Sequence, residues 1–371
     1  KLMKSKKPPV HLCEYRHMPL EEAEVLKEAK GDYIIRFKNH LAKKITFTDL
    51  IRGELSFDSD LIGDFSIAKD LDNSLYNFAV VVDDYEMKIT HIIRGEDHIA
   101  NTPKQILIQD ALGFSRPEYA HLPLILGPDR SKLSKRDAAT SVDDYRQAGY
   151  LPETMVNFMA LLGWNPGNER NESGSEIDIL SLKDLEEKLF DLNKVHKSGA
   201  IFDIKKLDWM NGEYIRKKSS AELVELSRPY LKDILDDSGS KLSEEYLESV
   251  LKLEQPRLKK LSELPEKTRY FFREPEYESD LLKWKNMDKA ALKESLQKSI
   301  KILEDNLAAS EKEIEKLFLE EAARGGDRGR LLWPLRAALS GQKASAGPFE
   351  ILAVLDRKES LKRLHKALDK I

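Results

Sequence analysis

Apolar residues in the second half of the chain recur at intervals of three and four. This spacing gathers apolar side chains on one face of a helix and therefore predicts amphipathic helices. Examples are Leu223, Leu226, Leu231, Leu303, Ile314, Leu317 and Phe318. After residue 221 no segment predicts a strand, and we find no repeat with a period of about 20 to 50 residues. We therefore expect a helical bundle and not a solenoid.

The first half of the chain alternates between strand and helix patterns. Residues 21–30 predict a short helix that ends at Gly31, and residues 33–37 and 45–48 predict strands. Further along, residues 89–94 and 122–126 predict two buried strands of one parallel sheet.

A helix over residues 104–112 is predicted between those two strands. Thr102 is its expected N-cap, and Pro103 follows at the first helical position. Strand, helix and strand in this spacing form a βαβ unit of a parallel sheet, and only about half of such a sheet is present. Another helix is predicted to begin at Pro152 and to end at Gly163.

The composition is that of an ordinary folded protein. The 371 residues are 41% hydrophobic and 34% charged, which suits two to four domains. A net charge of −4 excludes general electrostatic attraction to nucleic acid, so RNA binding would need local basic patches. Cys13 is the only cysteine, which excludes an internal disulfide and favours a reducing compartment. No apolar stretch approaches the roughly 20 residues of a membrane helix, and we expect a cytoplasmic protein.

Residues 129–136, with the sequence D-R-S-K-L-S-K-R, carry the strongest chemical signal. They follow a predicted strand and a Gly-Pro turn. Lys132 and Lys135 can bring mobile ammonium groups to phosphate oxygens, and Ser134 adds a hydroxyl donor. Such cations stabilise the charge that grows when a phosphate is attacked. The alternative is a solvated basic turn, which most lysine clusters are.

Four segments resemble one enzyme family, in the family's own order. Residues 132–136 are similar to the K-M-S-K-S signature of class I aminoacyl-tRNA synthetases. Residues 89–105 resemble the I-T-H-V-I-R-G-E-D-H … N-T-P-K-Q block of glutamyl-tRNA synthetases. Residues 209–216 resemble W-M-N-G-x-Y-I-R, and residues 334–341 resemble P-L-R-A-A-L-[TS]-G. The resemblance therefore runs through nearly the whole chain and points to a bacterial-type glutamyl-tRNA synthetase.

The resemblance implies an α/β catalytic region followed by an all-α region. Residues 1–75 would be the C-terminal part of the inserted acceptor-binding domain, and residues 76–140 the second half of the Rossmann-type catalytic domain. Residues 141–221 would form a stem-contact domain. Residues 222–371 would form the helical anticodon-binding domain, with two subdomains that meet near residue 281.

The resemblance also implies three residues of a glutamate pocket. Arg94 falls on the family arginine that binds the side-chain carboxylate of glutamate, a role that suits a planar guanidinium. Tyr76 falls on a tyrosine of the same pocket, and Val80 shapes its wall. Without the resemblance, the favoured reading of Arg94 is an ion pair with a nearby carboxylate: Asp83, Asp84 or Glu96.

For the other ligands, the resemblance implies an ATP site that includes both motif lysines. Its residues would be Glu96, Asp97, His98, His121, Leu124, Ile125, Lys132 and Lys135. Mg²⁺ would arrive with ATP. Some relatives bind zinc through cysteines, but Tyr15 stands where a ligand cysteine would be, so we expect no structural metal. Anticodon recognition would fall to Arg257, Arg336 and Ser345.

The implied function is ATP-dependent ligation of L-glutamate to tRNA(Glu) through a glutamyl-adenylate, by a monomer. We find nothing like the family's P-S-P-T-G-x-x-H-x-G motif, so we expect this chain alone not to activate glutamate. A non-catalytic tRNA-binding protein is the main alternative, although it would not need Lys132, Lys135 or Arg94. A glutaminyl enzyme or the short tRNA-modifying paralogue agrees less well with the helical C-terminal region. Whether glutamine tRNA is also charged stays open.

Overall fold

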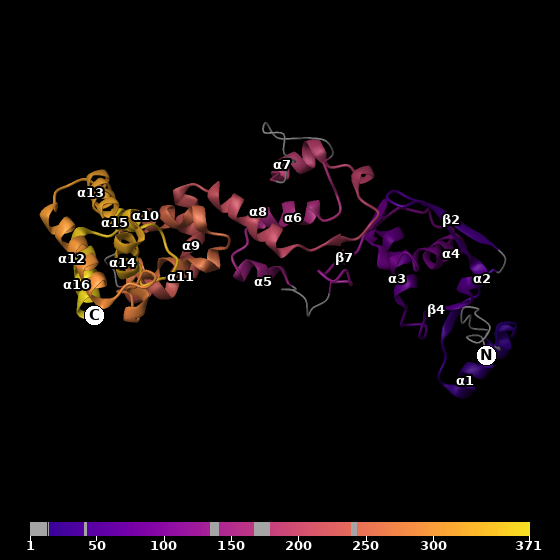
Figure 1. The fold of residues 1–371 in the computed structure, drawn as a ribbon. Coiled ribbons are helices and arrows are strands. Elements are labelled where there is room, and N and C mark those ends of the chain that lie inside the picture. Colours follow the sequence, from indigo (N-terminus) through magenta and orange to yellow (C-terminus); the bar gives the residue numbers. More distant parts are fainter. Residues whose placement is uncertain (1–12, 14, 41–42, 134–140, 167–178, 239–242) are drawn as a thin grey trace. The chain divides into compact units, whose positions relative to one another are not determined.

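The computed structural model describes residues 13, 15–40, 43–133, 141–166, 179–238 and 243–371. The chain divides into two compact units. The first consists of Lys1–Ala138 and Met159–Asp203, and the second of Ala139–Phe158 and Ile204–Ile371. All strands of the described residues belong to the first unit, and the part of the second unit that is described is helical (Figure 1). An α/β first half and an all-α second half were expected, and this fold class is confirmed.

A four-stranded sheet organises the first unit, in the order β3-β2-β6-β5. Strands β2 (Lys44–Asp49) and β3 (Gly53–Asp58) form an antiparallel hairpin. Strands β5 (His91–Gly95) and β6 (Glu118–Leu122) are parallel, with Arg94 opposite His121. The hairpin joins this pair where Asp49 meets Tyr119. The sheet therefore continues across the domain boundary predicted at residue 75.

The βαβ unit of the first half is confirmed, but its second strand is shifted. Helix α4 (Thr102–Leu112) connects β5 to β6, which ends at Leu122. Residues 122–126 were expected to form one buried strand, and this was wrong. Pro123 cannot donate a backbone hydrogen bond, and Leu122 is 36% exposed. The next short strand, β7 (Ile125–Leu126), instead pairs with β8 (Ala200–Ile201).

The start of α4 also differs from the prediction. Asn101 occupies the N-cap position, and Thr102 is already the first helical residue. The Thr102 hydroxyl lies 2.8 Å from Nη2 of Arg94 and accepts its hydrogen bond. The side chain expected to cap the helix therefore contacts the neighbouring strand.

The remaining elements of the first unit lie outside this sheet. The predicted helix near the start is present as α1, which Gly31 ends with a φ of +76° as expected. Strands β1 and β4 form a small antiparallel sheet. The bounds are α1 (Leu20–Lys30), β1 (Ile35–Phe37), α2 (Ser59–Ile62), β4 (Phe65–Ala68), α3 (Tyr76–Glu86), η2 (Glu96–His98), α7 (Leu182–Asp184), η3 (Leu185–Leu189) and η4 (Leu192–Lys194).

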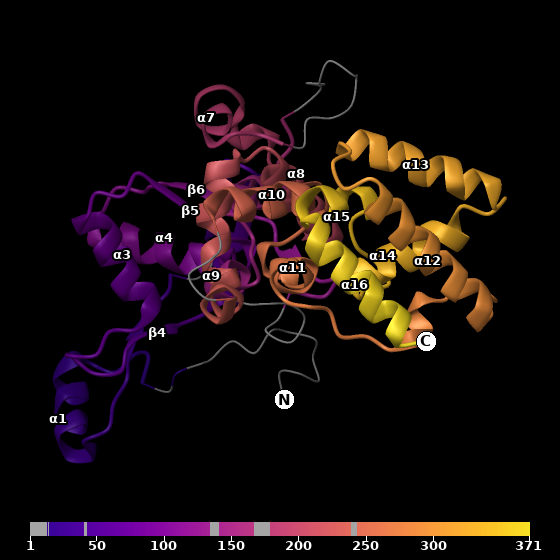
Figure 2. The ribbon, with the colours of Figure 1, turned by 90° about the vertical axis from the view of Figure 1, so that its left-hand side faces the viewer.

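The second unit is a bundle of helices. Helices α12, α14 and α16 pack against one another in Figures 1 and 2. The bounds are α5 (Val142–Gln147), α6 (Pro152–Leu161, divided between the units), α8 (Ile204–Arg216), α9 (Ser220–Ser238), α10 (Glu244–Glu254), η5 (Gln255–Arg257), η6 (Leu261–Glu263), α11 (Leu264–Phe272), η7 (Ser279–Leu282), α12 (Lys289–Asp305), α13 (Glu311–Arg324), α14 (Gly329–Ser340), α15 (Pro348–Val354) and α16 (Arg357–Asp369).

Five of the seven apolar residues named from the spacing are buried: Leu223, Leu231, Leu303, Ile314 and Phe318. Leu226 and Leu317 are half-buried. Burying such side chains stabilises the fold by about 1.5–3 kcal/mol each. Across the described ranges, no helix combines the length and apolar character needed to cross a bilayer.

Candidate active site

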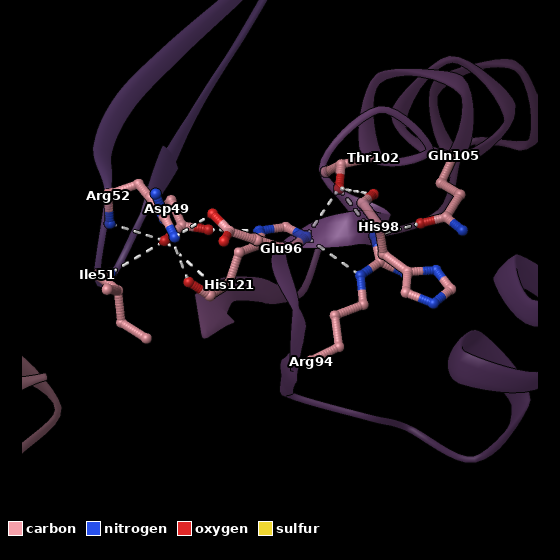
Figure 3. A network of polar contacts seen from close by, with 9 residues as sticks. All are labelled: Asp49, Ile51, Arg52, Arg94, Glu96, His98, Thr102, Gln105 and His121. Carbon is pink, nitrogen blue, oxygen red and sulfur yellow. Dashed lines mark hydrogen bonds and ion pairs between the residues drawn. The ribbon is translucent and has the colours of Figure 1, made fainter. Parts of the chain in front are cut away.

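Arg94 lies at the centre of a polar network at the ends of β5 and β6 (Figure 3). Its Nη2 donates to Oγ1 of Thr102 and to Oε1 of Gln105, each at 2.8 Å, and its Nε donates to Nε2 of His121 at 3.2 Å. Gln105 in turn donates from Nε2 to Asn77 at 3.1 Å, which leaves its oxygen facing Arg94. Three neutral acceptors therefore orient the guanidinium.

The ion pair considered for Arg94 is not formed with Glu96. Glu96 instead pairs with Arg52, and its other oxygen accepts the backbone N–H of Leu124 at 3.0 Å. Among the described residues, no hydrogen bond joins Arg94 to a carboxylate. Asp84 is the carboxyl whose charge bears on Arg94. Burial raises the Asp84 pKa, and Arg94 lowers it by a smaller amount.

His121 and Asp49 form a fully buried pair beside Arg94. Nδ1 of His121 lies 2.6 Å from Oδ2 of Asp49, and their exposures are 0% and 1%. Burial lowers the pKa of His121, and the Arg94 charge lowers it further, although Asp49 acts in the opposite direction. Burial alone would raise the pKa of Asp49. Hydrogen bonds from Arg52, His121 and Ile51 more than offset this, and the Asp49 pKa is lowered.

The predicted pocket residue Tyr76 is at the first turn of α3, 50% exposed. Its hydroxyl lies 3.4 Å from Nδ1 of His98, which follows β5. Val80 lies four residues further along α3 and is half-buried. Tyr76 and Val80 therefore share one face of α3, as residues four apart do.

The motif loop begins directly after β7. Gly127 donates its backbone N–H to Ser131 at 2.9 Å, and Arg130 adopts a positive φ of 64°. Nζ of Lys132 then lies 3.0 Å from Oδ2 of Asp97, and this contact is the main reason that the Asp97 pKa is lowered. Ser134 and Lys135 fall outside the described residues.

The three residues predicted for anticodon recognition belong to the second unit. Arg336 donates from Nη1 to the Ser345 hydroxyl at 3.2 Å, and its guanidinium carbon lies 4.6 Å from the ring centre of Trp333. Arg257, in η5, donates from Nη2 to Oε2 of Glu350 at 2.5 Å. The structure thus brings Arg336 and Ser345 together, while Arg257 is held in an ion pair.

Comparison with known proteins assigns the family. A model of the catalytic domain of class I tRNA synthetases (E and Q) matches residues 2–209, which is more than half of the chain. The chain belongs to the class I tRNA synthetases. A model of an anticodon binding domain matches residues 222–368 of the same chain.

Several relatives of this synthetase are named glutamate–tRNA ligase. The ligase of Natranaerobius thermophilus is 39% identical over 356 residues, which are 95% of this chain and 71% of the relative. That of Aquifex aeolicus is 39% identical over 359 residues, or 96% and 73% of the two chains. A solved glutamate tRNA ligase of Elizabethkingia meningosepticum, crystallised with its amino acid, superposes with a TM-score of 0.77 at 31% identity, covering 95% of this chain and 71% of that one. This synthetase is therefore a ligase of tRNA aminoacylation.

Two groups of contacts in the synthetase were not predicted from the sequence. Asp49 stands 72 positions before His121, and no motif marks it. Trp333 and Glu350 contact the predicted anticodon arginines from α14 and α15. In contrast, Thr102 and Gln105 belong to the N-T-P-K-Q segment, which could have signalled their role beside Arg94.

The predicted absence of a structural metal stays a prediction for this synthetase. Across the described part of the chain, no group of three or more histidine, cysteine or acidic side chains could hold a metal ion. Tyr15, at the position where some relatives have a ligand cysteine, accepts a hydrogen bond from Lys30 at 3.4 Å.

Proposed function

We propose that this synthetase ligates L-glutamate to tRNA(Glu) through a glutamyl-adenylate, with ATP and Mg²⁺ as co-substrates. In the first step an α-carboxylate oxygen of glutamate attacks the α-phosphorus of ATP, and pyrophosphate leaves. In the second step a terminal ribose hydroxyl of the tRNA attacks the activated carbonyl and loses its proton, and AMP leaves.

The unused donors of Arg94 carry this proposal. Its Nε and both protons of Nη2 have neutral acceptors, so Nη1 remains available for a ligand within the described surroundings. A half-buried cation without a hydrogen-bonded carboxylate suits the γ-carboxylate of glutamate, whereas the neutral amide of glutamine would not compensate its charge. Because both protons of Nη2 have acceptors, we expect the ligand carboxylate to meet Nη1 alone and not two guanidinium nitrogens at once.

Further residues support an adjacent nucleotide site. Glu96 receives the backbone N–H of Leu124, so two residues expected near ATP are in contact. Lys132 reaches Asp97 from the motif loop, which supports the proposal that this loop closes over the phosphates of ATP. We propose Glu96, Asp97, His98, Leu124, Ile125, Lys132 and Lys135 as the nucleotide-binding residues.

His121 requires a different role. Its ring is fully buried, and both ring nitrogens already have partners within the protein. A direct contact to ATP is therefore not proposed.

For the RNA, we propose that residues 222–371 read the anticodon and that residues 141–221 contact the stem. The match of residues 222–368 to an anticodon binding domain supports the first assignment. A non-catalytic tRNA-binding protein would share the helical unit, but it would not need an arginine oriented by three neutral acceptors.

Charging measurements test the proposed function directly. The chain joined to a family segment that carries the P-S-P-T-G-x-x-H-x-G motif, here called the full-length enzyme, is incubated with ATP, Mg²⁺, purified tRNA(Glu) or tRNA(Gln), and labelled glutamate or glutamine. We expect glutamate to be attached to tRNA(Glu) and glutamine to be rejected. Charging with glutamine alone would show a glutaminyl enzyme, and tight tRNA binding without charging would favour the non-catalytic alternative.

A further inference from the structure

The contacts of His121 with Arg94 and Asp49 determine which ring nitrogen of His121 carries the proton. Nε of an arginine is always a donor, so Nε2 of His121 must accept at their 3.2 Å contact. A neutral imidazole with an acceptor at Nε2 carries its proton on Nδ1. That proton is donated to Oδ2 of Asp49 at 2.6 Å. One tautomer of His121 therefore satisfies both neighbours.

The carboxylate of Asp49 is itself fixed in orientation. Its Oδ1 accepts the backbone N–H groups of Ile51 at 3.0 Å, Arg52 at 2.9 Å and His121 at 3.3 Å. Its Oδ2 is left for the imidazole. The plane of the His121 ring is thus set by a group that three backbone donors hold, at the point where β2 joins β6.

The charges around the pair favour a neutral His121 beside an ionised Asp49. Arg52 and Arg94 are the cations that lower the His121 pKa, and Asp49 is the anion that raises it. The other groups that face the ring are the side chains of Phe47 on β2, Tyr119 on β6 and Thr102 on α4. None of these three is charged at neutral pH.

We propose that Asp49 and His121 form a positioning pair, which fixes the tautomer and plane that hold Arg94 with Nη1 directed toward the γ-carboxylate of glutamate. The inference rests on the proposed function, because it assigns glutamate to Arg94. A carboxylate that orients a histidine through its Nδ1–H is a general device of enzyme sites. Here the histidine does not transfer a proton; it accepts from the arginine that selects the substrate.

Asp49→Asn is the most informative substitution. The single amide oxygen is needed at the Oδ1 position, where three N–H groups converge. The amide NH₂ then faces Nδ1 of His121 and forces the proton to Nε2. The Thr102 hydroxyl, 3.2 Å from Nε2, can accept this proton, but Nε–H of Arg94 then faces a second donor and loses its acceptor. The side-chain volume has hardly changed.

Two substitutions of His121 separate its contacts. In His121→Gln, the amide reaches the place of Nε2, so its oxygen can still accept from Arg94. In His121→Asn, the amide reaches the place of Nδ1, which keeps the contact to Asp49 and loses the one to Arg94. If positioning of Arg94 is the role, His121→Gln retains more glutamate affinity than His121→Asn.

The first measurement is steady-state activation of glutamate by the full-length enzyme. We expect Asp49→Asn and His121→Asn to raise the glutamate KM by about ten- to hundredfold, the scale of one lost charge-assisted hydrogen bond. We expect His121→Gln to raise it less, and the KM for ATP to stay within about twofold in all three. The control is Tyr119→Phe, two residues before His121 on β6, which removes a buried hydrogen bond to Gln109 on α4 and leaves the contact between Asp49 and His121 in place.

The second measurement reports the tautomer without any activity. In nitrogen-15 spectra of histidine-labelled protein, the ring signals that disappear in His121→Gln belong to His121. We expect protonation at Nδ1 in the wild type and at Nε2 in Asp49→Asn. Protonation at Nε2 in the wild type would overturn the inference.

The outcomes separate the inference from the proposed function. If Arg94→Ala leaves the glutamate KM unchanged, the assignment of glutamate to Arg94 fails. If Arg94→Ala raises the KM but Asp49→Asn does not, the positioning pair alone is wrong. Tyr119→Phe shows how far the glutamate KM rises when the protein is merely destabilised. If the KM of every other variant rises only in proportion to the fall in its thermal midpoint, as it does in Tyr119→Phe, the pair is merely structural.

Discussion

Arg94 shows how a single side chain can be prepared for a charged ligand. Its neighbours accept hydrogen bonds without neutralising its charge, since they are a hydroxyl, an amide and a neutral imidazole. Glu96, two residues further along the chain, is paired with Arg52 instead. The positive charge of Arg94 therefore remains without a hydrogen-bonded carboxylate among the described residues.

Removal of this guanidinium is expected to affect glutamate alone. Arg94→Ala should raise the glutamate KM by about ten- to hundredfold, equivalent to a charge-assisted bond of about 1.5–3 kcal/mol. The KM for ATP should hardly change. The control is Arg116→Ala, which removes an exposed arginine that pairs with Asp110. An unchanged glutamate KM would place the carboxylate partner elsewhere.

Lys132 forms an ion pair that is easily exchanged for another. The Lys132 and Asp97 side chains are 62% and 45% exposed, and ion pairs in water are weak. Lys132 can therefore leave Asp97 for a phosphate at little cost. Lys132→Ala should slow adenylate formation by roughly 10²–10³-fold, with little change in glutamate affinity. Single-turnover rates measure this, with the exposed Lys69→Ala as the control, and a normal rate would contradict a role in the chemistry.

At the scale of elements, the turn between α5 and α6 depends on a glycine. Gly149 has a φ of +87°, and a Cβ atom there would lie 2.5 Å from the backbone nitrogen of Leu261. Its carbonyl accepts the Leu261 N–H at 3.2 Å and a side-chain N–H of Asn211 at 3.1 Å. This close approach connects the turn to η6.

Gly149→Ala should consequently lower the free energy of unfolding by more than the strain of a positive φ alone would. We expect a loss of roughly 2–4 kcal/mol from the free energy of unfolding, because strain and steric overlap add. Gly113→Ala is the matched control. Gly113 also has a positive φ, +69°, but no atom lies within 4 Å of the added Cβ, so we expect about 1 kcal/mol. Equal losses in denaturant titrations would show that the contact with Leu261 does not matter.

The end of α10 buries an acidic side chain, Glu254, at 2% exposure. Burial raises its pKa, and Arg257 opposes this only in part. Because the folded pKa lies above the ordinary value of 4.5, the stability linked to this group is complete below that pH. It is then lost as the pH rises through the folded pKa.

Glu254→Gln should therefore raise the thermal midpoint at about pH 8. In the protein itself the Tyr270 hydroxyl donates to Oε1 of Glu254 at 3.3 Å. The amide of glutamine still offers an oxygen to this hydroxyl, and no charge has to be buried. The gain should shrink as the pH falls toward 4.5. Glu248→Gln, at an exposed position of the same helix, should show no such trend. A lower midpoint for Glu254→Gln at high pH would mean that the buried charge is favourable.

At the scale of the whole molecule, amino-acid and RNA recognition are proposed for different units. The net charge of −4 offers no general attraction to RNA, so recognition must rest on local groups. Arg336 is placed against Trp333 and Ser345, and Arg257 is paired with Glu350. Guanidinium groups of this kind can stack on unpaired bases and bond their edges.

Loss of either arginine should alter base preference. Arg257→Ala and Arg336→Ala should each cost about 1–3 kcal/mol of binding, mostly at single anticodon positions. Binding of the 371-residue chain to anticodon stem-loop variants is measured at a fixed salt concentration. The control is Arg324→Ala, an exposed arginine on α13. Weakening that is uniform across the variants would instead identify phosphate contacts.

The sequence by itself determined the family, the helical second half and the βαβ unit. These follow from patterns within short segments: apolar spacing, strand runs and motifs of a few adjacent residues. Local backbone preferences and contiguous motifs are visible without knowledge of the fold. They also indicated Arg94 and Lys132 as site residues, but not the side chains that contact either of them.

Only the tertiary structure decided the contacts between distant segments. Asp49 and His121 are 72 residues apart, and Arg257 and Glu350 are 93 apart. The strand end predicted at residue 126 failed because the position of β6 is set by its pairing with β5 and β2. Such pairings depend on how strands and helices pack in three dimensions, and a buried aspartate looks in sequence like any other. The contacts that orient Arg94, and the protonation of His121 and Asp49 beside it, therefore depend on the tertiary fold.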